Sequence, residues 1–393
     1  MNAILDKFKQ IIYFAAQELH NIVKDSGVIL IFFVATLLYP ALYAFVYQKE
    51  AIDELPVAVI DNDNTQTSRK LVKMLDASSD IAITEKINDF QQAEHLFLEK
   101  KIYGIITLDN GFEKQVMKGE QAHMGVYCDG SYIMHYKTVL TAATKAGLTF
   151  GAGVQAKKLM MKGTPKSQLM AQISPVNLVS KPLFNATGGY GTYLMPPIMV
   201  LVIQQLLLIG IGMIGGTHRE KHKGKYIISE EIKERGWDSW FLGRALSYFI
   251  IFMLVAYYLF VLTFKWFDFP IHGTSSDAMV LLIPMILASV FLAMWISTYF
   301  YFRVQSMMLF LFTSFIFLFL SGISWPVEAF PAVFKWFAQI LPSTHGIQGI
   351  MKIQIFGAEL SEVQNHITAL WTLTAIFFTG SSLRFWQLSK MKN

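Results

Sequence analysis

The stretch SGISWPVEAFPAVFKWFAQILPSTHG, residues 321–346, decides the fold that we expect for this chain. Its prolines, at positions 326, 331 and 342, interrupt sequence that is otherwise apolar and rich in aromatic residues. The piece between the last two prolines, Ala332 to Leu341, is about half as long as the roughly 20 apolar residues that a helix needs to cross a bilayer. Because proline cannot continue a helix without losing a hydrogen bond and clashing with the previous turn, we expect the chain to turn back here.

The sequence around this stretch indicates an α-helical integral membrane protein. Of the 393 residues 53% are hydrophobic and only 16% are charged, a composition too apolar for an ordinary soluble enzyme. Six runs are long enough to span a membrane. They lie near Gly27–Tyr47, Tyr193–Gly215, Leu246–Phe264, Met279–Phe302, Ser306–Trp325 and Asn365–Leu383.

The basic residues that flank these runs predict the orientation. One side of the membrane carries Lys7, Lys9, Lys24, seven Lys or Arg residues within 216–244, Arg303, Arg384, Lys390 and Lys392. The short loops on the other side carry only Lys265, Lys335 and Lys352. Since basic loops stay in the cytoplasm, we expect both termini to be cytoplasmic and the long insert between the first two spans to lie outside.

The same pattern divides the chain into domains. Residues 1–26 are predicted to form a cytoplasmic interface helix, because the apolar positions from Ile4 to Val23 follow helical spacing and charged residues occupy the other face. Residues 27–47 form the first span, residues 48–192 an extracytoplasmic domain, and residues 193–393 the other five spans. The last part includes a charged cytoplasmic loop, 216–239.

The insert predicts an α/β domain, since the short apolar runs LPVAVID, IAIT, IYGIITL and HMGVYCD alternate with helical patterns. Its first strand ends in D-x-D-x-T, the arrangement that phosphatases of the haloacid dehalogenase class use. We favour a turn instead, with Asp61 and Asp63 at the strand end and Asn64 or Thr65 capping the next helix. The single cysteine, Cys128, excludes an intrachain disulfide.

No metal site and no catalytic residue are predicted. His218 and His222 have the spacing of zinc ligands on a helix, but the string HREKH places the glutamate wrongly for a metalloprotease. The centres of the spans contain no Asp, Glu, Lys or Arg, which disfavours an ion-coupled carrier. The only Gly-Lys pair, Gly224 and Lys225, lacks the rest of a phosphate-binding loop. Any transport must therefore be powered by another protein.

Several segments, in this order and at these spacings, resemble the membrane subunits of type-two ABC exporters, the permeases of bacterial drug and glycan export. They are QELHNIVKDSGVILIFFVATLLYPALYAF, the insert that opens LPVAVIDNDNTQTSRKL, PLFNATGGYGTYLMPPIMVLVIQQLLL, and LFLSGISWPVEAFPAVFKWFAQILPSTHGIQGI. The resemblance covers essentially the whole chain. It is most specific in the last segment, where the family has G-x-x-x-P, a second proline five residues later, and a proline before a turn that contains histidine.

The resemblance implies a set of residues for coupling to the ATPase: Glu18, Arg219, Glu220, Lys221, Gly224, Glu230 and Glu231. Here the chain departs from the family, which usually has a Gly-Thr-Leu-Glu-like string and a later proline, whereas this chain has GKYIISEEIKERG.

The resemblance also implies a re-entrant exit hairpin over residues 326–346, made of two short helices between the fifth and sixth spans. Its expected gate residues are Gly322, Trp325, Pro326, Pro331 and Pro342. The alternative is that the hairpin merely caps the bundle. Gln204 and Gln205, within the second span, are cavity candidates, although a hydrogen bond between helices explains buried amides equally well.

The sequence thus predicts the permease of an exporter in the bacterial inner membrane. The expected partners are cytoplasmic ABC ATPase subunits, a second permease, identical or homologous, and membrane lipids; a periplasmic adaptor is a further candidate, and nucleic acid is not expected. ATP and magnesium would act through the ATPase, and this chain itself needs no cofactor. The cargo suggested by composition is amphipathic or hydrophobic: a drug, lipid or glycan-like compound. The alternatives are a membrane-anchored receptor or scaffold that acts through the external domain, and an external phosphatase.

Overall fold

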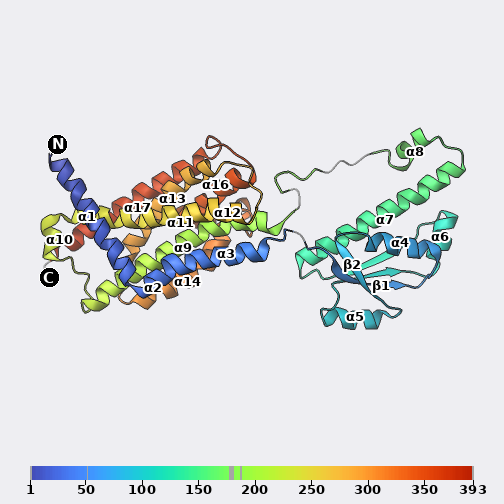
Figure 1. Ribbon diagram of the computed structural model, residues 1–393, viewed down its shortest axis with the longest axis horizontal. Coiled ribbons are helices and arrows are strands. Elements are labelled where there is room, and N and C mark those ends of the chain that lie inside the picture. Colours follow the sequence, from blue (N-terminus) through green and yellow to red (C-terminus); the bar gives the residue numbers. More distant parts are fainter. Residues whose placement is uncertain (1, 51, 177–180, 186–187, 392–393) are drawn as a thin grey trace. The chain divides into compact units, whose positions relative to one another are not determined.

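The structure, a computed structural model, describes residues 2–50, 52–176, 181–185 and 188–391 and contains two compact units (Figure 1). A helical unit comprises Met1–Glu50 and Pro182–Asn393, and an α/β unit comprises Ala51–Lys181. The α/β unit is thus an insertion into the helical unit, at nearly the boundaries expected for the external domain.

The helical unit consists of long helices joined by short helices and turns. Its elements are α1 (Asn2–Lys24), α2 (Ser26–Ile29), the π-helical turn η1 (Leu30–Ala35), α3 (Thr36–Tyr47), α9 (Tyr190–Lys221), α10 (Glu230–Arg235), α11 (Trp237–Tyr257), η2 (Tyr258–Leu262), α12 (Thr263–Trp266), α13 (Ser275–Ser297), α14 (Arg303–Leu320), η3 (Val327–Ala329), α15 (Ala332–Ile340), α16 (Pro342–Ile350), η4 (Met351–Ile355) and α17 (Gln364–Lys390).

Within the described residues, five continuous helical segments are long and apolar enough to cross a membrane. They are Ser26–Tyr47, Tyr190–Lys221, Trp237–Trp266, Ser275–Ser297 and Arg303–Leu320. Each contains most of one of the first five predicted spans. The chain is therefore mostly helical and has the apolar helices of an integral membrane protein.

Two of the predicted boundaries are wrong. The fourth span was expected to reach Phe302, but α13 ends at Ser297, and residues 299–302 form a turn before α14. The fifth was expected to reach Trp325, but α14 ends at Leu320, and Gly322 adopts a positive φ of 88° in the turn that follows. Hydropathy could not locate the first turn because residues 299–302 are all aromatic, and it could not locate the second because Ile323 and Trp325 extend the apolar run past Gly322.

The sixth predicted span lies inside α17. This helix has 27 residues, about 40 Å of helix, which is long enough to cross a bilayer. Its threonines, serines and charged end make it less apolar than the five segments above. It packs along α13, to which it is tied by a hydrogen bond of 3.0 Å from the Thr374 hydroxyl to the Pro284 carbonyl. A sixth crossing stays a prediction.

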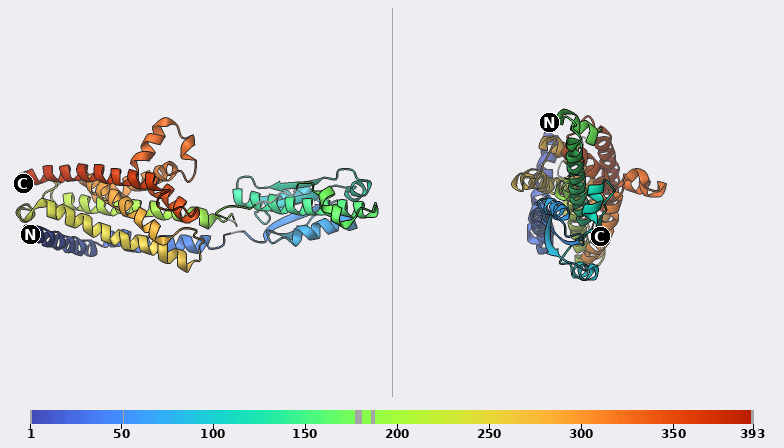
Figure 2. Two further views of the ribbon diagram at one scale, coloured as in Figure 1. Left: turned by 90° about the horizontal axis from the view of Figure 1, so that it is seen from above. Right: turned by 90° about the vertical axis from the view of Figure 1, so that its right-hand side faces the viewer.

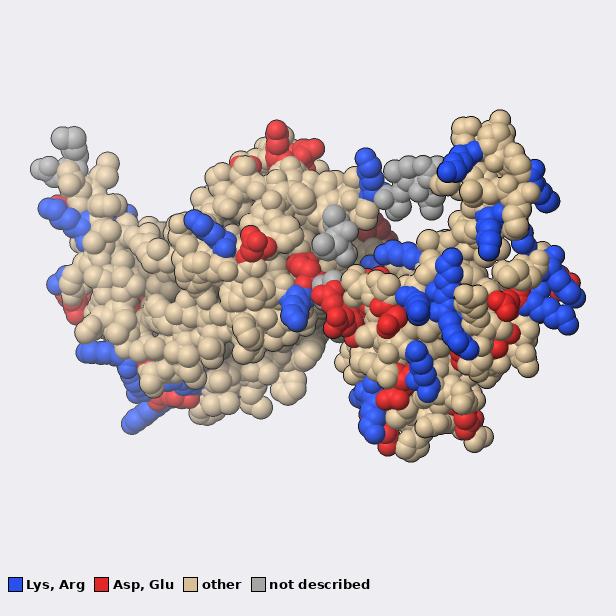
Figure 3. Space-filling view, turned by 45° about the vertical axis from the view of Figure 1, so that its right-hand side comes forward, with Lys and Arg blue, Asp and Glu red and all other residues tan. Residues whose placement is uncertain are grey.

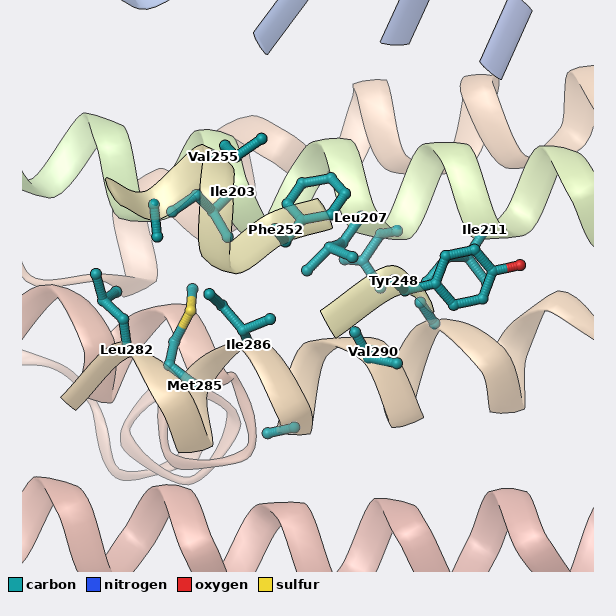
Figure 4. Close-up of a cluster of buried hydrophobic side chains, with 14 of the residues drawn as sticks. Ile203, Leu207, Ile211, Tyr248, Phe252, Val255, Leu282, Met285, Ile286 and Val290 are labelled. Carbon is teal, nitrogen blue, oxygen red and sulfur yellow. The ribbon is translucent and has the colours of Figure 1, made fainter. Parts of the chain in front are cut away.

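The core of the helical unit lies between α9, α11 and α13. Side chains from these three helices point into one volume, among them Leu207, Phe252 and Ile286 (Figure 4). Since lipid tails are as apolar as these side chains, close packing and hydrogen bonds rather than exclusion of water must hold such helices together in a membrane.

Glycines allow the closest helix contacts. A Cβ on Gly216 of α9 would lie 2.7 Å from the Arg303 backbone, and one on Gly243 of α11 would lie 2.7 Å from the Ile11 carbonyl oxygen of α1. Any larger residue would force these elements apart. The contact at Gly243 seats α1 directly on α11.

The α/β unit is a four-stranded sheet with helices on both faces. Its elements are β1 (Leu55–Asp61), α4 (Gln66–Asp76), β2 (Ile81–Lys86), α5 (Phe90–Leu98), β3 (Gly104–Leu108), α6 (Phe112–Lys118), β4 (Met124–Cys128), α7 (Ile133–Met161) and α8 (Lys166–Ile173). The strand order is β2-β1-β3-β4; β1 is parallel to β2 and β3, and β4 is antiparallel to β3.

Alternating side chains of β1 build the two cores of this unit. Val57 and Val59 pack with residues of α4 and α7, whereas Ala58 and Ile60 pack with Ala93 of α5 on the opposite face. Because β1 is buried on both faces, its sequence is continuously apolar, which is why it was recognisable as a strand.

Candidate functional site at the charged end of the helical unit

Lys and Arg side chains gather at the end of the helical unit that carries α10, while much of the neighbouring face is uncharged (Figure 3). Several residues that the sequence singled out for coupling lie in the elements at this end: α1, the end of α9, and α10 with the loop before it.

A buried ion pair joins α1 to α11. Glu18 and Arg244 are only 6% and 3% exposed, and the Arg244 Nε donates to Glu18 Oε1 at 2.9 Å. The Arg244 Nη1 and Nη2 atoms donate to the hydroxyls of Tyr226 and Tyr248, at 3.0 and 3.1 Å, and the Tyr248 hydroxyl donates to Glu18. A charge pair that is removed from water must have its remaining groups hydrogen-bonded, and two tyrosines do this here.

Glu18 is therefore not a surface residue. Its carboxylate is bound to Arg244, whose guanidinium also lies over the Trp240 ring at 5.0 Å from the ring centre. A partner protein could not touch Glu18 without displacing Arg244 and the two tyrosines. If Glu18 contributes to coupling, it does so through its contact with Arg244 of α11.

A second ion pair, between Asp25 and Arg303, joins the start of α2 to the start of α14. Asp25 also caps α2, since its Oδ1 accepts the backbone N–H groups of Gly27 and Val28 at 3.1 and 3.2 Å. Burial by itself would raise the pKa of the Asp25 carboxyl, but the hydrogen bonds from Arg303 and the backbone, together with the Arg303 charge, hold it below its ordinary 3.8.

The predicted coupling residues at the end of α9 have different environments. Arg219 is buried and lies over the Tyr301 ring, 4.6 Å from its centre, while the Glu220 carboxylate accepts the Arg303 backbone N–H at 2.8 Å. Lys221 is exposed. Gly224 has a φ of 83° and donates its N–H to the Arg219 carbonyl at 2.9 Å, so it ends the helix as C-terminal glycines commonly do.

Glu230 and Glu231 form the first turn of α10. Their carboxylates lie 2.9 and 3.4 Å from Lys233 Nζ and Arg235 Nε, three and four residues further along the helix. Such solvent-accessible ion pairs contribute little to stability.

The segment that contains α10 is in turn attached to α1. The Arg235 guanidinium of α10 lies over the Tyr13 ring of α1, 4.8 Å from the ring centre, and just after α10 the Asp238 carboxylate, in the first turn of α11, lies 2.7 Å from Lys7 Nζ of α1. A force on α10 would thus reach α1 and, through Glu18, α11.

The two histidines at this end use ring nitrogens for backbone contacts. His218 Nε2 lies 2.7 Å from the Ile227 carbonyl oxygen, and His222 Nδ1 lies 2.7 Å from the His218 carbonyl oxygen. Throughout the part of the chain that the structure describes, no cluster of three or more His, Cys, Asp or Glu side chains could hold a metal ion.

The cavity candidates Gln204 and Gln205 are buried inside the bundle, 0% and 8% exposed. Gln204 Oε1 accepts the Ser343 backbone N–H at 2.7 Å, which ties α9 to the first turn of α16. Among the described residues, the Gln204 Nε2 and both amide atoms of Gln205 have no hydrogen-bond partner. Gln204 therefore makes a hydrogen bond between helices, whereas the side-chain amide of Gln205 makes none within the described chain.

The proline-rich stretch folds into two helices of nine residues, α15 and α16. Pro326 precedes η3, Pro331 is the N-cap of α15, and Pro342 begins α16. α16 is buried against α9, α13 and α17, whereas the orange segment around α15 projects from the bundle in both views of Figure 2. Trp325 and most apolar side chains of α15 are exposed, Trp336 to 75%.

The D-x-D-x-T motif of the α/β unit forms the expected turn. Thr65 is the N-cap of α4, and Asp61 accepts the Ser68 hydroxyl at 2.7 Å. Asp63 accepts the backbone N–H groups of Gly111 and Glu113, both at 2.9 Å, and so holds α6 against the start of α4. The carboxylates that a phosphatase would need free are thus engaged in local structure.

The residues that sequence analysis missed are the partners in these ion pairs. Arg244, Asp25 and Arg303 each lie at or near the end of an apolar run, where a charge is ordinarily explained by exposure to water. The available signal was that Arg244 lies seven residues inside a helix, α11, that continues directly into a span. The tyrosines Tyr226 and Tyr248 carried no recognisable signal.

Comparisons with known proteins agree over nearly the whole chain. Residues 26–383 match the family model described as ABC-2 family transporter protein. The linearmycin resistance permease protein LnrN of Bacillus subtilis (strain 168) is 21% identical over 392 residues, which cover 95% of this chain and 98% of that protein. Both matches include the α/β unit as well as the helices.

Proposed function

Because this chain belongs to the ABC-2 family of transporter proteins, we propose that it is the permease of an ATP-driven exporter, paired with a second permease in the bacterial inner membrane. The observation that carries the proposal is the family match over residues 26–383, which includes all five of the long apolar helices. The predicted resemblance to ABC export permeases is confirmed by the same match.

ATP would be hydrolysed by separate cytoplasmic subunits. Members of this family are membrane subunits without an ATPase motif, and no phosphate-binding loop occurs in the sequence. The ATPase would bring its own magnesium.

The proposed docking surface for the ATPase is α10 with the exposed end of α9. Lys221, Glu230 and Glu231 are exposed there. Movement of α10 would be transmitted to α1 by the contact between Arg235 and Tyr13, and from α1 to α11 by the buried Glu18–Arg244 pair. This arrangement supports a route from the ATPase into the bundle.

The proposed contact with a second permease is α14. Only 11% of this 18-residue helix is buried inside the protein, the smallest share among the five apolar helices of the described chain. Its uncovered side chains are large, with Phe312, Phe315 and Phe319 exposed on it. Such a face needs either lipid or another protein, and a dimer would close the transport pathway along it.

The proposed orientation places both termini and α10 in the cytoplasm, the α/β unit outside, and α17 as the sixth span. It rests on the distribution of Lys and Arg described above. The α15 hairpin would then lie at the outer end of the bundle and form the exit gate. The prolines restrict its backbone, and the hydrogen bond between Gln204 and Ser343 ties α16 to α9. Both features support a hairpin with a defined position in the bundle.

The proposed cargo is an amphipathic or hydrophobic compound that is toxic to the cell. The support is the aromatic and aliphatic composition together with the similarity to a protein named for resistance to linearmycin. A reconstituted complex should show ATP hydrolysis that amphipathic compounds stimulate. Stimulation by polar compounds alone would rule this cargo class out.

The decisive test is gentle purification of the chain from its native membrane, followed by mass spectrometry of the proteins that remain bound. We expect an ATPase subunit with a phosphate-binding loop, and either one or two kinds of permease. Recovery of the chain alone, or with external proteins only, would contradict the proposal and favour the membrane-anchored receptor or scaffold.

A further inference from the structure

A cavity of about 530 Å³ opens between α1, α2, α9, α11 and α14, at the charged end of the helical unit. Its volume lies within the roughly 300–1,000 Å³ range of pockets that bind small molecules. Polar and charged side chains form nearly all of its wall, and Ile214 is the only aliphatic contributor.

The charges on this wall do not balance. Its two carboxylates, Glu18 and Asp25, are each engaged by an arginine, Arg244 and Arg303 respectively. Two further cations, the ammonium groups of Lys24 and Lys221, also line the cavity. Neither ammonium lies within ion-pair distance of a carboxylate in the described parts of the chain. The cavity therefore has an excess of positive charge that a bound anion would neutralise.

A hydroxyl in the same wall lacks a partner. The Thr217 Oγ1 atom is buried, and no described residue hydrogen-bonds to it. A buried hydroxyl without a partner is costly, so a ligand oxygen at this place would be stabilised. Ser26 and Asn21 add further donors to the wall. Convergent hydroxyl, amide and ammonium donors are the groups that bind phosphate oxygens.

The surface next to the cavity is apolar. Ser26, which lines the cavity, begins a helical segment on which Leu30, Val34, Leu38 and Leu42 follow at intervals of four residues. Residues at this spacing share one face of a helix, and all four leucine or valine side chains are exposed. A ligand with its anionic end in the cavity would therefore find an apolar track leading away from it.

We propose that this cavity binds the phosphate headgroup of an anionic phospholipid, whose acyl chains lie along the Leu30–Leu42 face of the first apolar helix. Lys24 and Lys221 supply the charge, and Thr217 donates a hydrogen bond to a phosphate oxygen. Basic pockets between membrane helices bind lipid headgroups in this way. The site is distinct from the proposed cargo pathway, and it would clamp α1 to the ends of α2 and α9.

The test is native mass spectrometry of the purified full-length protein titrated with dioleoylphosphatidylglycerol or with zwitterionic dioleoylphosphatidylcholine. We expect the phosphatidylglycerol to be retained preferentially. Each lysine near a lipid surface contributes about fivefold in affinity, so K24Q/K221Q should weaken phosphatidylglycerol binding by on the order of thirtyfold. T217V, which removes one hydrogen bond to a charged oxygen and keeps the shape, should weaken it by roughly tenfold.

The matched control is K223Q/K225Q, which removes two exposed positive charges from the loop that follows α9, outside the cavity wall. It should leave the preference for phosphatidylglycerol within about threefold of wild type, because screening reduces the effect of charges away from the site. An equal loss in both double variants would show general charge attraction and overturn the proposal. Binding of glycerol 1-phosphate as tight as that of the lipid would equally overturn it, since the site would then take a free phosphate ester.

Discussion

At the scale of single residues, the charged end of the helical unit depends on groups that are buried and mutually compensated. Glu18 and Arg244 would each be costly to bury alone, and they are stable only because each satisfies the other with the help of two tyrosine hydroxyls. Removing one partner should therefore lower the stability of the protein strongly, whereas replacing both partners by apolar residues should lower it much less.

We therefore expect Glu18→Gln to destabilise the purified protein by about 3–5 kcal/mol, because it leaves the Arg244 charge buried and unpaired. The double variant Glu18→Leu with Arg244→Met should recover most of that loss. Thermal unfolding in detergent measures both. Lys7→Gln, which breaks an exposed pair, serves as the control and should leave the melting temperature unchanged. A single variant as stable as wild type would mean that the pair is not buried.

Asp63 gives a prediction with a pH dependence. Burial would raise the pKa of this carboxyl, but hydrogen bonds from the Thr65 hydroxyl and from the backbone N–H groups of Glu113, Gly111 and Phe112 favour the charged form and lower the pKa below 3.8. Since the pKa is lower in the folded state, the stabilisation is fully present above the unfolded-state pKa and disappears as the pH falls through the folded-state pKa.

Asp63→Asn should therefore speed amide hydrogen exchange severalfold at residues 111–113 at neutral pH, and the wild type should lose the same protection below pH 3.8. Exchange measured by mass spectrometry on the full chain, normalised to intrinsic rates, tests this. Asp109→Asn, in the same loop with an exposed side chain, is the control. Unchanged protection in the Asp63 variant would contradict the role of this carboxylate.

At the scale of elements, prolines and a glycine shape the hairpin. The pattern of prolines predicted that the chain turns back, and α15 and α16 do form two short helices there. What the pattern could not predict is their unequal burial: α16 fills the bundle next to Gln204, while α15 exposes most of its apolar side chains.

Gly322 lies in the turn that leads from α14 into the hairpin, and it gives the third prediction. A Cβ at this position would lie 2.7 Å from the Val327 Cγ2, and its φ of 88° is unfavourable for any β-branched residue. Gly322→Val should thus displace the hairpin and lower export severalfold while permease and ATPase still copurify. Val333→Ala, at an exposed position of α15, is the control. Normal export by Gly322→Val would count against the gate and favour a simple cap.

At the scale of the whole molecule, the uncovered face of α14 predicts the dimer contact. Single cysteines at Phe312 or Phe315, in a Cys128→Ser background, should cross-link two permease chains in native membranes. Leu254→Cys, exposed on α11, should cross-link far less, since that helix is not proposed to meet a partner. The product is read as a band of dimer size on a non-reducing gel, and mass spectrometry identifies the second chain. Equal cross-linking at both sites would mean random collision.

Much of the fold followed from sequence because of simple physical requirements. A membrane span needs a long apolar run, and a strand buried on both faces needs a short one, so α9 and β1 were both recognisable. Helix ends were predicted less well. The turn at residues 299–302 consists of aromatic residues, like much of the helices around it. Hydropathy measures only how apolar these residues are and does not report their backbone conformation.

The sequence by itself determined that this chain is a mostly helical membrane protein with an inserted α/β unit and no ATPase motif of its own, since composition, run length and motifs are local properties. Only the tertiary structure decided which charges meet. Glu18 and Arg244 are separated by 226 residues, and Asp25 and Arg303 by 278, yet each pair is brought together by helix packing. The cavity beside them exists for the same reason, because its wall is assembled from segments that no local pattern connects.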